Sequence, residues 1–338
     1  MRTRLLTRLC RTVQLVVLVA VPAFPVAAEP LFGLPLVCPQ GSICPIQQFA
    51  DLDPGPGARD PWCGTKTYDG HKGTDFRVLS MQDVARGVEV VAMADGVVKA
   101  SRDGMADRLV ATDADRKAVS SRECGNGLIL DHGEGYETQY CHMRQGSLRL
   151  APGAKVRKGD VLGLVGASGM AQFPHVHVTL RRDGKVTDPF TGLEAGQACA
   201  VYETAAEFSG RMDAKALADF AAPELPTVLS AGFADRPVND RELVQSGVPT
   251  PPGRLSQALV GYIWAINLAK GDRFMLRIEK NGQVFSEQTT EPLDRSKAVY
   301  VAYSGKKGAP AAGHYRLEAA IVRQGRKIAL ESSELTLK

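Results

Sequence analysis

The stretch that decides the fold reads PHVHVTL (residues 174–180), in which polar and apolar side chains alternate. This alternation predicts a β-strand, where residues two positions apart point to the same face. His175 and His177 therefore share one face, while Val176 and Val178 face the core. A single His-x-His pair is only a weak indication of a metal site, because a histidine on an apolar strand is more often a structural core residue.

A second pattern lies upstream, in the segment HKGTD that begins at His71 and ends at Asp75. A spacing of four returns to about the same face in a helix or a strand, and Gly73 allows close backbone approach. Two imidazoles and one carboxylate form a Zn²⁺ ligand set that leaves one tetrahedral position open, as catalytic sites require. The sequence therefore predicts one zinc ion per chain, held by His71, Asp75 and a histidine of the His175 and His177 pair.

The distribution of histidine and cysteine supports this prediction. Five of the six histidines lie between His71 and His177. The alternative, a zinc site made of thiolates, lacks support because the chain has no Cys-x-x-Cys pair. Six cysteines follow residue 28, and an even number in an exported chain suggests three disulfides. Many pairings are possible; one consistent set joins Cys38–Cys44, Cys63–Cys199 and Cys124–Cys141.

Residues 1–28 have the pattern of a secretory signal peptide. Four arginines precede the apolar run VQLVVLVAV (13–21), which is short for a membrane span, and small residues follow it. An uncleaved anchor is the alternative. The same four arginines account for the whole formal net charge of +4, so we expect no nucleic-acid partner. We expect an exported, periplasmic or extracellular protein without stable membrane insertion after signal cleavage.

Composition and periodicity divide the rest of the chain into four parts. The first two are a Cys-, Pro- and Gly-rich irregular arm (29–63) and a domain of short β-strands (64–200). A helical segment and linker (201–249) follows, with a helix expected over 203–221, and a β-sandwich of immunoglobulin-like kind (250–338) ends the chain. Within the second part, the polar stretch 102–124 is expected to be a long loop or a loop with a small ribbon. In the last part, about six alternating stretches predict strands, and Asn281-Gly282 predicts a hairpin turn.

The order of the motifs resembles the lysostaphin-type zinc metalloendopeptidases, also called the LytM domain family. The likeness covers about residues 65–190. It is carried by GHKGTDFRV (70–78), ADGVVKAS (94–101), GNGLILDHGEGYETQYCHM (125–143), VRKGDVLGLVGASG (156–169) and PHVHVTL (174–180). The resemblance implies a mainly β protein, whose antiparallel LytM-type domain carries zinc on the floor of a groove. The 102–124 insertion is our candidate for one wall of that groove.

The resemblance also implies a role for each histidine of the motifs. His71, Asp75 and His177 match the metal ligands, while His142 and His175 match the two catalytic histidines that act on water and substrate. His132 matches a frequent but non-catalytic histidine, so we expect it to be structural.

Some features depart from the family pattern. Met170-Ala-Gln-Phe173 precedes the His-x-His motif where small residues are usual. The 102–124 insertion is unusual, and Cys141 lies inside the Tyr-x-His element. None of these departures removes a ligand; they bear on groove shape and substrate preference. His314, outside the motifs, is expected to be a surface or core residue.

The expected activity is hydrolysis of peptide bonds by zinc-activated water, with peptidoglycan cross-link peptides as substrate. The alternative is a catalytically silent LytM-type regulator that activates cell-wall amidases, but such regulators usually lack metal ligands. The C-terminal sandwich is a candidate for binding cell-wall polymer or a protein partner. Its aromatic residues include Tyr262, Trp264, Tyr300 and Tyr303. They would form a binding face or, as is more usual in a sandwich, part of the core.

Overall fold

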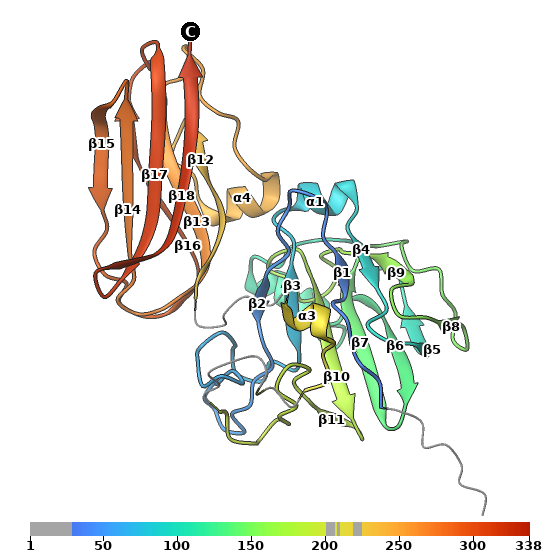
Figure 1. Cartoon of the computed structure of the whole chain (residues 1–338). Helices are drawn as coiled ribbons and strands as arrows, with labels where there is room; N and C mark the ends of the chain where they lie inside the picture. Colours follow the sequence, from blue (N-terminus) through green and yellow to red (C-terminus); the bar gives the residue numbers. More distant parts are fainter. Residues whose placement is uncertain (1–28, 201–206, 208–209, 219–224) are drawn as a thin grey trace, which may run out of the picture.

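The computed structural model describes residues 29–200, 207, 210–218 and 225–338 (Figure 1). The predicted signal peptide lies outside the described residues. The described chain is mainly β and forms two β-rich units, an N-terminal one and a C-terminal one (Figure 1). Among the described residues, no helix has both the length and the apolar character needed to span a membrane.

The N-terminal unit is built on one large antiparallel sheet with a smaller one beside it. The large sheet has the order β2 (Ile46–Gln48), β3 (Thr74–Arg77), β10 (His175–Arg182), β7 (Tyr136–Met143), β6 (Asn126–Gly133), β5 (Gly96–Arg102) and β8 (Lys155–Val156), with β11 (Lys185–Val186) paired to β10. The small sheet consists of β1 (Leu36–Val37), β4 (Glu89–Val91) and β9 (Val161–Leu164). Helix α1 (Met81–Arg86) follows β3.

Strand β10 lies inside the large sheet, between β3 and β7, as its apolar residues require. Val176 is 0 % exposed and Val178 3 % exposed, and both belong to the core of this unit. The prediction that the two valines face the core is therefore confirmed. His175 and His177 project from the opposite face of the strand.

The predicted irregular arm, residues 29–63, is part of the fold. It contributes β1 to the small sheet and β2 to the edge of the large one. Phe32 and Phe49 are almost fully buried in the core, because the arm carries apolar side chains between its turns. Outside these two short strands the arm is irregular.

Three disulfides join the cysteines in the set that the sequence suggested: Cys38–Cys44, Cys63–Cys199 and Cys124–Cys141. The second of these bonds links residues 136 positions apart and so encloses every motif of the metal site. The third ties the end of the 102–124 insertion to β7.

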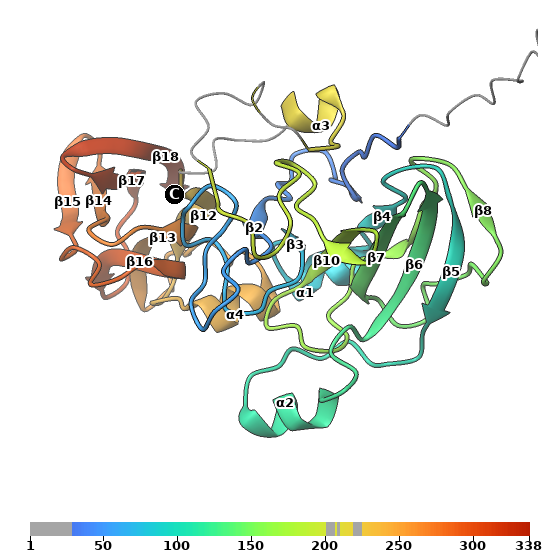
Figure 2. The same ribbon diagram turned by 90° about the horizontal axis from the view of Figure 1, so that it is seen from below.

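The insertion carries a helix, not a ribbon. Helix α2 (Asp113–Val119) extends away from the large sheet (Figure 2). Thr112 caps its first turn by accepting from the Asp115 backbone N–H, and the Asp115 side chain accepts from the Thr112 backbone in return. This reciprocal pair is a capping box, which satisfies two free amides at a helix start.

The C-terminal unit has two antiparallel sheets. One has the order β12 (Thr227–Ala234), β13 (Ala258–Leu268), β16 (Lys297–Lys307); the other β15 (Gln283–Thr289), β14 (Arg273–Lys280), β17 (Gly313–Arg323), β18 (Arg326–Leu337). Both sheets contribute to one core that includes Ile263, Phe274 and Leu317. Asn281 and Gly282 have φ of 49° and 79°, the hairpin turn expected between β14 and β15.

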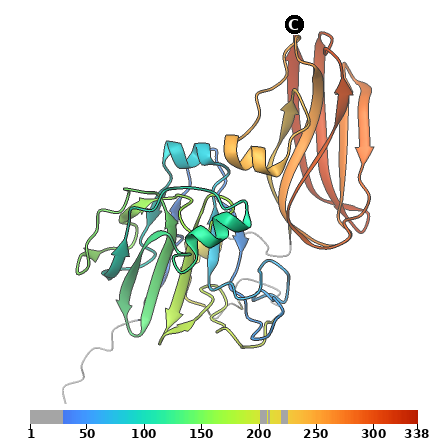
Figure 3. The ribbon, with the colours of Figure 1, turned by 180° about the vertical axis from the view of Figure 1, so that it is seen from behind.

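The segment 201–249 differs from its prediction. Helix α3 is limited to Ala214–Ala218, and β12 and α4 (Asp240–Ser246) occupy the stretch expected to be linker. Residues 210–213 of the predicted 203–221 helix are not helical, and residues 203–206, 208–209 and 219–221 lie outside the described residues. Helix α4 lies beside α1 of the N-terminal unit (Figure 3).

The aromatic residues of the C-terminal unit are mostly buried rather than arrayed as a binding face. Tyr262 and Trp264 are 0 % exposed and Tyr300 is partly buried, while Tyr303 is 45 % exposed. Trp264 lies in a cluster that also contacts residues of the N-terminal unit, Leu79, Leu109 and Phe173.

Candidate metal centre

Three side chains converge at the junction of β3 and β10. His71 lies just before β3, Asp75 lies on it, and His177 lies on β10 directly opposite Asp75. The Nε2 atom of His71 is 3.2 Å from Asp75 Oδ1 and 3.1 Å from His177 Nδ1, and the last two atoms are 2.8 Å apart. Among the described residues, these three are the group whose donor atoms are clustered closely enough to hold a metal ion.

Gly73 allows this convergence. A Cβ atom at this position would lie 2.3 Å from the Val178 carbonyl oxygen and 2.8 Å from His177 Nε2, distances far inside van der Waals contact. Only glycine lets the chain before β3 approach β10 so closely. The glycine between the two ligands of the HKGTD segment is therefore required by packing.

Backbone and side-chain contacts fix the orientation of the two imidazoles. His71 Nδ1 donates to the Phe49 carbonyl oxygen at 2.6 Å, which leaves the Nε2 lone pair toward the centre. His177 turns the other way, with Nδ1 toward the centre and Nε2 3.1 Å from Thr179 Oγ1. The arm thus supplies, through Phe49, an orienting contact for a ligand.

The charge of the cluster suits a divalent cation. Burial disfavours ionisation of Asp75, but its interactions with His71, His175 and His177 outweigh burial, so the pKa of Asp75 lies well below the usual value. Burial is the main reason that the pKa of His177 is lowered. An ionised carboxylate and two imidazole lone pairs fit Zn²⁺ in charge and donor type.

Two further imidazoles, those of His142 and His175, lie beside this cluster. Their ring centroids are 4.6 Å apart, and His175 Nε2 lies 3.5 Å from Asp75 Oδ1. The Nδ1 atom of His142 donates to the Ser168 carbonyl at 2.8 Å, and that of His175 donates to the Phe173 carbonyl at 2.8 Å. Each ring therefore has an unprotonated Nε2 when neutral.

Both of these imidazoles are held in the neutral form. Burial is the first cause, and nearby histidines add to it, so the pKa of His142 lies well below its usual value and that of His175 is also lowered. A neutral imidazole is able to accept a proton and return it, the property required of a general base and acid.

The remaining histidines lie outside the site. His132 bridges the Asp95 carbonyl oxygen and Thr138 Oγ1, at 2.7 Å each, and has a structural role. His314, on β17, pairs with Glu334 at the surface.

Two aromatic residues that the sequence did not assign to the site contact its histidines. The ring of Tyr68 lies 4.5 Å from that of His71, and the tyrosine is 51 % exposed. The ring of Phe173 stacks on His175 at 4.5 Å. Tyr68 has no sequence signal, because it precedes the HKGTD segment in an irregular loop. Phe173 was visible in the sequence as a departure from the family pattern.

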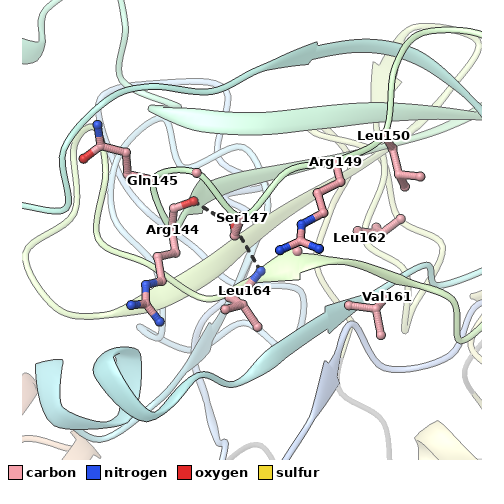
Figure 4. A pocket seen from close by; sticks show the side chains of 10 residues that line it. Arg144, Gln145, Ser147, Arg149, Leu150, Val161, Leu162 and Leu164 are labelled. Atoms are coloured by element: carbon pink, nitrogen blue, oxygen red, sulfur yellow. Dashed lines mark hydrogen bonds between the residues drawn. The ribbon is translucent and has the colours of Figure 1, made fainter.

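A hollow of about 600 Å³ lies apart from this cluster, between residues 144–150 and β9 (Figure 4). Arg144 and Arg149 border it, and Ser147 closes one side by accepting from the Leu164 N–H and donating to the Arg144 carbonyl. None of the four histidines in or beside the cluster lines it.

Comparison with known proteins bears on this geometry. Residues 69–189 match the family model described as Peptidase family M23. This part of the chain is a peptidase family M23 domain. The resemblance to the lysostaphin-type peptidases is thereby confirmed, and the M23 domain contains every residue of the cluster.

Relatives of the M23 domain are found among bacterial enzymes. It is 34% identical over 103 residues to the DD-carboxypeptidase/endopeptidase Mpg of Neisseria meningitidis, covering 30% of this chain and 21% of that protein. It is 29% identical over 116 residues to the peptidoglycan DD-endopeptidase ShyA of Vibrio cholerae, covering 34% and 21%. A zinc-containing peptidase from Vibrio cholerae matches with a TM-score of 0.32 and 22% identity, over 50% of this chain and 40% of that one. The chain spans about a fifth of the length of the two curated relatives.

Proposed function

We propose that this protein is an exported zinc metalloendopeptidase that hydrolyses peptide bonds in peptidoglycan cross-link peptides. The observation that carries the proposal is the convergence of His71, Asp75 and His177, with the neutral imidazoles of His142 and His175 beside them. The names of the curated relatives, both peptidases with endopeptidase activity and one of them acting on peptidoglycan, support the substrate class. The regulator alternative is not favoured, because the ligand set is complete.

The residues divide into two groups. His71, Asp75 and His177 would hold one zinc ion, which when bound supplies Lewis-acid polarisation of a peptide carbonyl and a lowered pKa for water. His142 and His175, each with Nδ1 committed to a backbone carbonyl, would use Nε2 to take a proton from the attacking water and deliver one to the leaving amine.

Export to the periplasm or the exterior is part of the proposal. It is supported by the signal-peptide pattern of residues 1–28 and by the three disulfides, which persist in oxidising compartments. We expect no nucleic-acid partner.

We further propose that the C-terminal unit is an immunoglobulin-like sandwich that begins at Thr227 rather than at residue 250. Its three-stranded sheet faces a four-stranded one across a common core, as in sandwiches of that kind. The strand β12 pairs with β13 along its whole length, so it belongs to this unit. A cell-wall or protein partner for the unit stays a proposal.

The test is digestion of purified peptidoglycan by the full chain, with the released fragments identified by mass spectrometry. We expect new amino and carboxyl ends at peptide cross-links, and no such fragments from His71→Ala, which should also lose its zinc. Hydrolysis at the wild-type rate by a zinc-free His71→Ala protein would refute the proposal. So would a zinc-loaded wild-type protein that releases no fragment.

A further inference from the structure

Arg77 is a buried cation held between aromatic rings of the two units. It lies on β3, two positions after Asp75, and is 1 % exposed. Its guanidinium carbon is 4.9 Å from the ring centroid of Phe173, in the M23 domain, and 4.8 Å from that of Trp264, on β13 of the C-terminal unit. Both distances fall within the range of a cation–π interaction.

Few hydrogen bonds hold this guanidinium. Its Nη1 donates to Gln47 Oε1 at 2.5 Å, whereas Nε and Nη2 have no hydrogen-bond partner within the described parts of the chain. Asp240 of the C-terminal unit supplies a compensating charge, because its carboxylate attracts Arg77. The same carboxylate accepts the Trp264 Nε1–H at Oδ1, at 2.9 Å. The position of Arg77 therefore depends largely on its ring contacts and on residues of the C-terminal unit.

Phe173 extends this stack to the candidate active site. Its ring lies against the imidazole of His175 at 4.5 Å, with only 29° between the two planes. Its carbonyl oxygen accepts the Nδ1–H of the same imidazole at 2.8 Å. One residue thus sets both the tilt and the tautomer of His175, and is itself packed against Arg77.

Further contacts between the two units surround this stack. Leu79, which follows β3, and Leu109, in the insertion, pack with Phe173 against the cluster that contains Trp264. At a separate point, Asn267 Nδ2 donates to the Ile46 carbonyl oxygen of β2 at 3.2 Å. The C-terminal unit therefore contacts β2, the segment after β3 and the insertion.

We propose that the C-terminal unit positions His175 for the reaction through the series Trp264, Arg77 and Phe173. This inference rests on the proposed function and assigns the C-terminal unit a part in it. The three are positioning residues, and none belongs to the ligand cluster. Phe173, which departs from the family pattern, is the residue that makes the connection in this chain.

The kinetic test compares Trp264→Ala with Trp264→Phe and with Ile263→Ala in the full chain. Ile263 is the neighbouring residue of β13, is also 0 % exposed, and faces the core between the two sheets, so its truncation damages the unit without touching the stack. We expect Trp264→Ala to lower kcat about tenfold or more, because small displacements of a catalytic group are costly. KM and zinc content should stay near wild type. Trp264→Phe, which keeps a ring over Arg77, should retain most of the activity, and Ile263→Ala should lose thermal stability but not kcat.

A double variant tests whether the residues act as one series. If Trp264 and Phe173 act through the same stack, the loss in kcat for Trp264→Ala/Phe173→Ala is smaller than the product of the two single losses. Independent, multiplying losses would overturn the proposal, as would equal losses of kcat in Ile263→Ala and Trp264→Ala.

A measurement that does not depend on activity separates this inference from the proposed function. In ¹H–¹⁵N spectra of the histidine rings of the zinc-free protein, Trp264→Ala should shift the signals of His175 and leave those of His132 in place. If the wild-type protein hydrolyses no peptide, the proposed function fails and the spectra still test the positioning. If the protein is active and Trp264→Ala changes neither kcat nor the His175 signals, the positioning fails alone.

Discussion

The backbone decides which nitrogen each histidine presents to the centre. His71, His142 and His175 each donate from Nδ1 to a carbonyl oxygen of a different segment, so that Nε2 is the free atom. His177 has the opposite arrangement, with Nδ1 beside Asp75. Because the carbonyls of Phe49 and Ser168 lie far in sequence from His71 and His142, the orientations of these two rings depend on the folded chain and not on the motifs alone.

The roles of the two histidine groups are separable by mutation. His142→Ala should bind zinc as the wild type does, because His142 is outside the ligand cluster, and should lose about two to four orders of magnitude in kcat as a general acid–base residue does. Metal analysis by mass spectrometry and muropeptide release check both parts. His132→Ala is the matched control and should lose stability only. A zinc-free His142→Ala protein would contradict this division.

At the scale of single residues, the sequence predicted the features that follow from its periodicity. The alternation around His175 and His177 placed both imidazoles on one face, and the burial of Val176 agrees with it. The stack on Arg77 was not predictable, because it joins residues far apart in the chain, and Tyr68 gave no signal because it lies in an irregular loop. Phe173 was visible as an unusual residue, but its partner Trp264 lies in another unit.

Among the elements, β7 ends in a constrained backbone conformation. His142 has φ of 62°, a left-handed conformation that is rare for a residue with a Cβ, and its N–H donates to the Cys124 carbonyl at 2.8 Å. The adjoining Cys124–Cys141 disulfide keeps this partner in place. The insertion thus supports the backbone of His142, the proposed acid–base residue.

Removal of that disulfide should affect chemistry more than metal binding. In Cys124→Ser/Cys141→Ser we expect kcat to fall about tenfold or more with zinc retained, since the backbone at His142 loses its tether. The control is Cys38→Ser/Cys44→Ser, which removes a bond of the arm and should leave kcat unchanged. An unchanged kcat in the first variant would show that the hydrogen bond to Cys124 suffices.

The loop after β11 contains a buried acid that gives stability a pH dependence. Asp188 Oδ1 accepts from the backbone N–H groups of Phe190 and Thr191, while Oδ2 is buried without a partner among the described residues. Burial, together with the nearby Asp60, raises the pKa of Asp188 to about 6, although its hydrogen bonds oppose the shift.

The folded state therefore binds more protons than the unfolded state between the ordinary aspartate pKa of 3.8 and about 6, so stability falls as pH rises through this window. The loss is on the order of 3 kcal/mol from this group. Asp188→Asn, which keeps the acceptor, should flatten the dependence. Urea denaturation at pH 4.5 and pH 7 measures the free energy of unfolding of both proteins. An equal change between the two pH values in the wild type and in Asp188→Asn would contradict this role of Asp188.

The strands in which polar and apolar residues alternate clearly were predicted. Strand β12 and helices α2 and α4, whose patterns are weaker or shorter, were not predicted. Strand β12 contains Ser230 and Gly232, which weaken its apolar pattern. Helices α2 and α4 are short, and their capping residues Thr112 and Asn239 were the available signals. Such caps determine where a helix begins only once packing stabilises it.

In the molecule as a whole, the two units share an interface through Trp264, so ligand binding in one should stabilise the other. The chain has two tryptophans, and Trp62→Phe leaves Trp264 as the sole tryptophan fluorophore, at the interface. Zinc at about one hundred times its Kd should stabilise the M23 domain by about 3 kcal/mol. We therefore expect zinc to raise the temperature at which the fluorescence emission of Trp264 changes on unfolding.

The control for this coupling is the same measurement in His71→Ala, where added zinc should not move the transition. Independent unfolding of the two units would leave the Trp264 transition unchanged by zinc even in the protein that binds it.

The Cys63–Cys199 disulfide has a consequence for resistance to proteolysis. It closes a covalent ring that contains all five histidines of the M23 domain and Asp75. A protease that cuts the exposed helix α2 opens the ring at one point but releases no fragment, and the β-sheet pairings on both sides of the cut remain. A nicked protein should therefore run as one species until it is reduced, and it should keep its activity in an environment rich in other hydrolases.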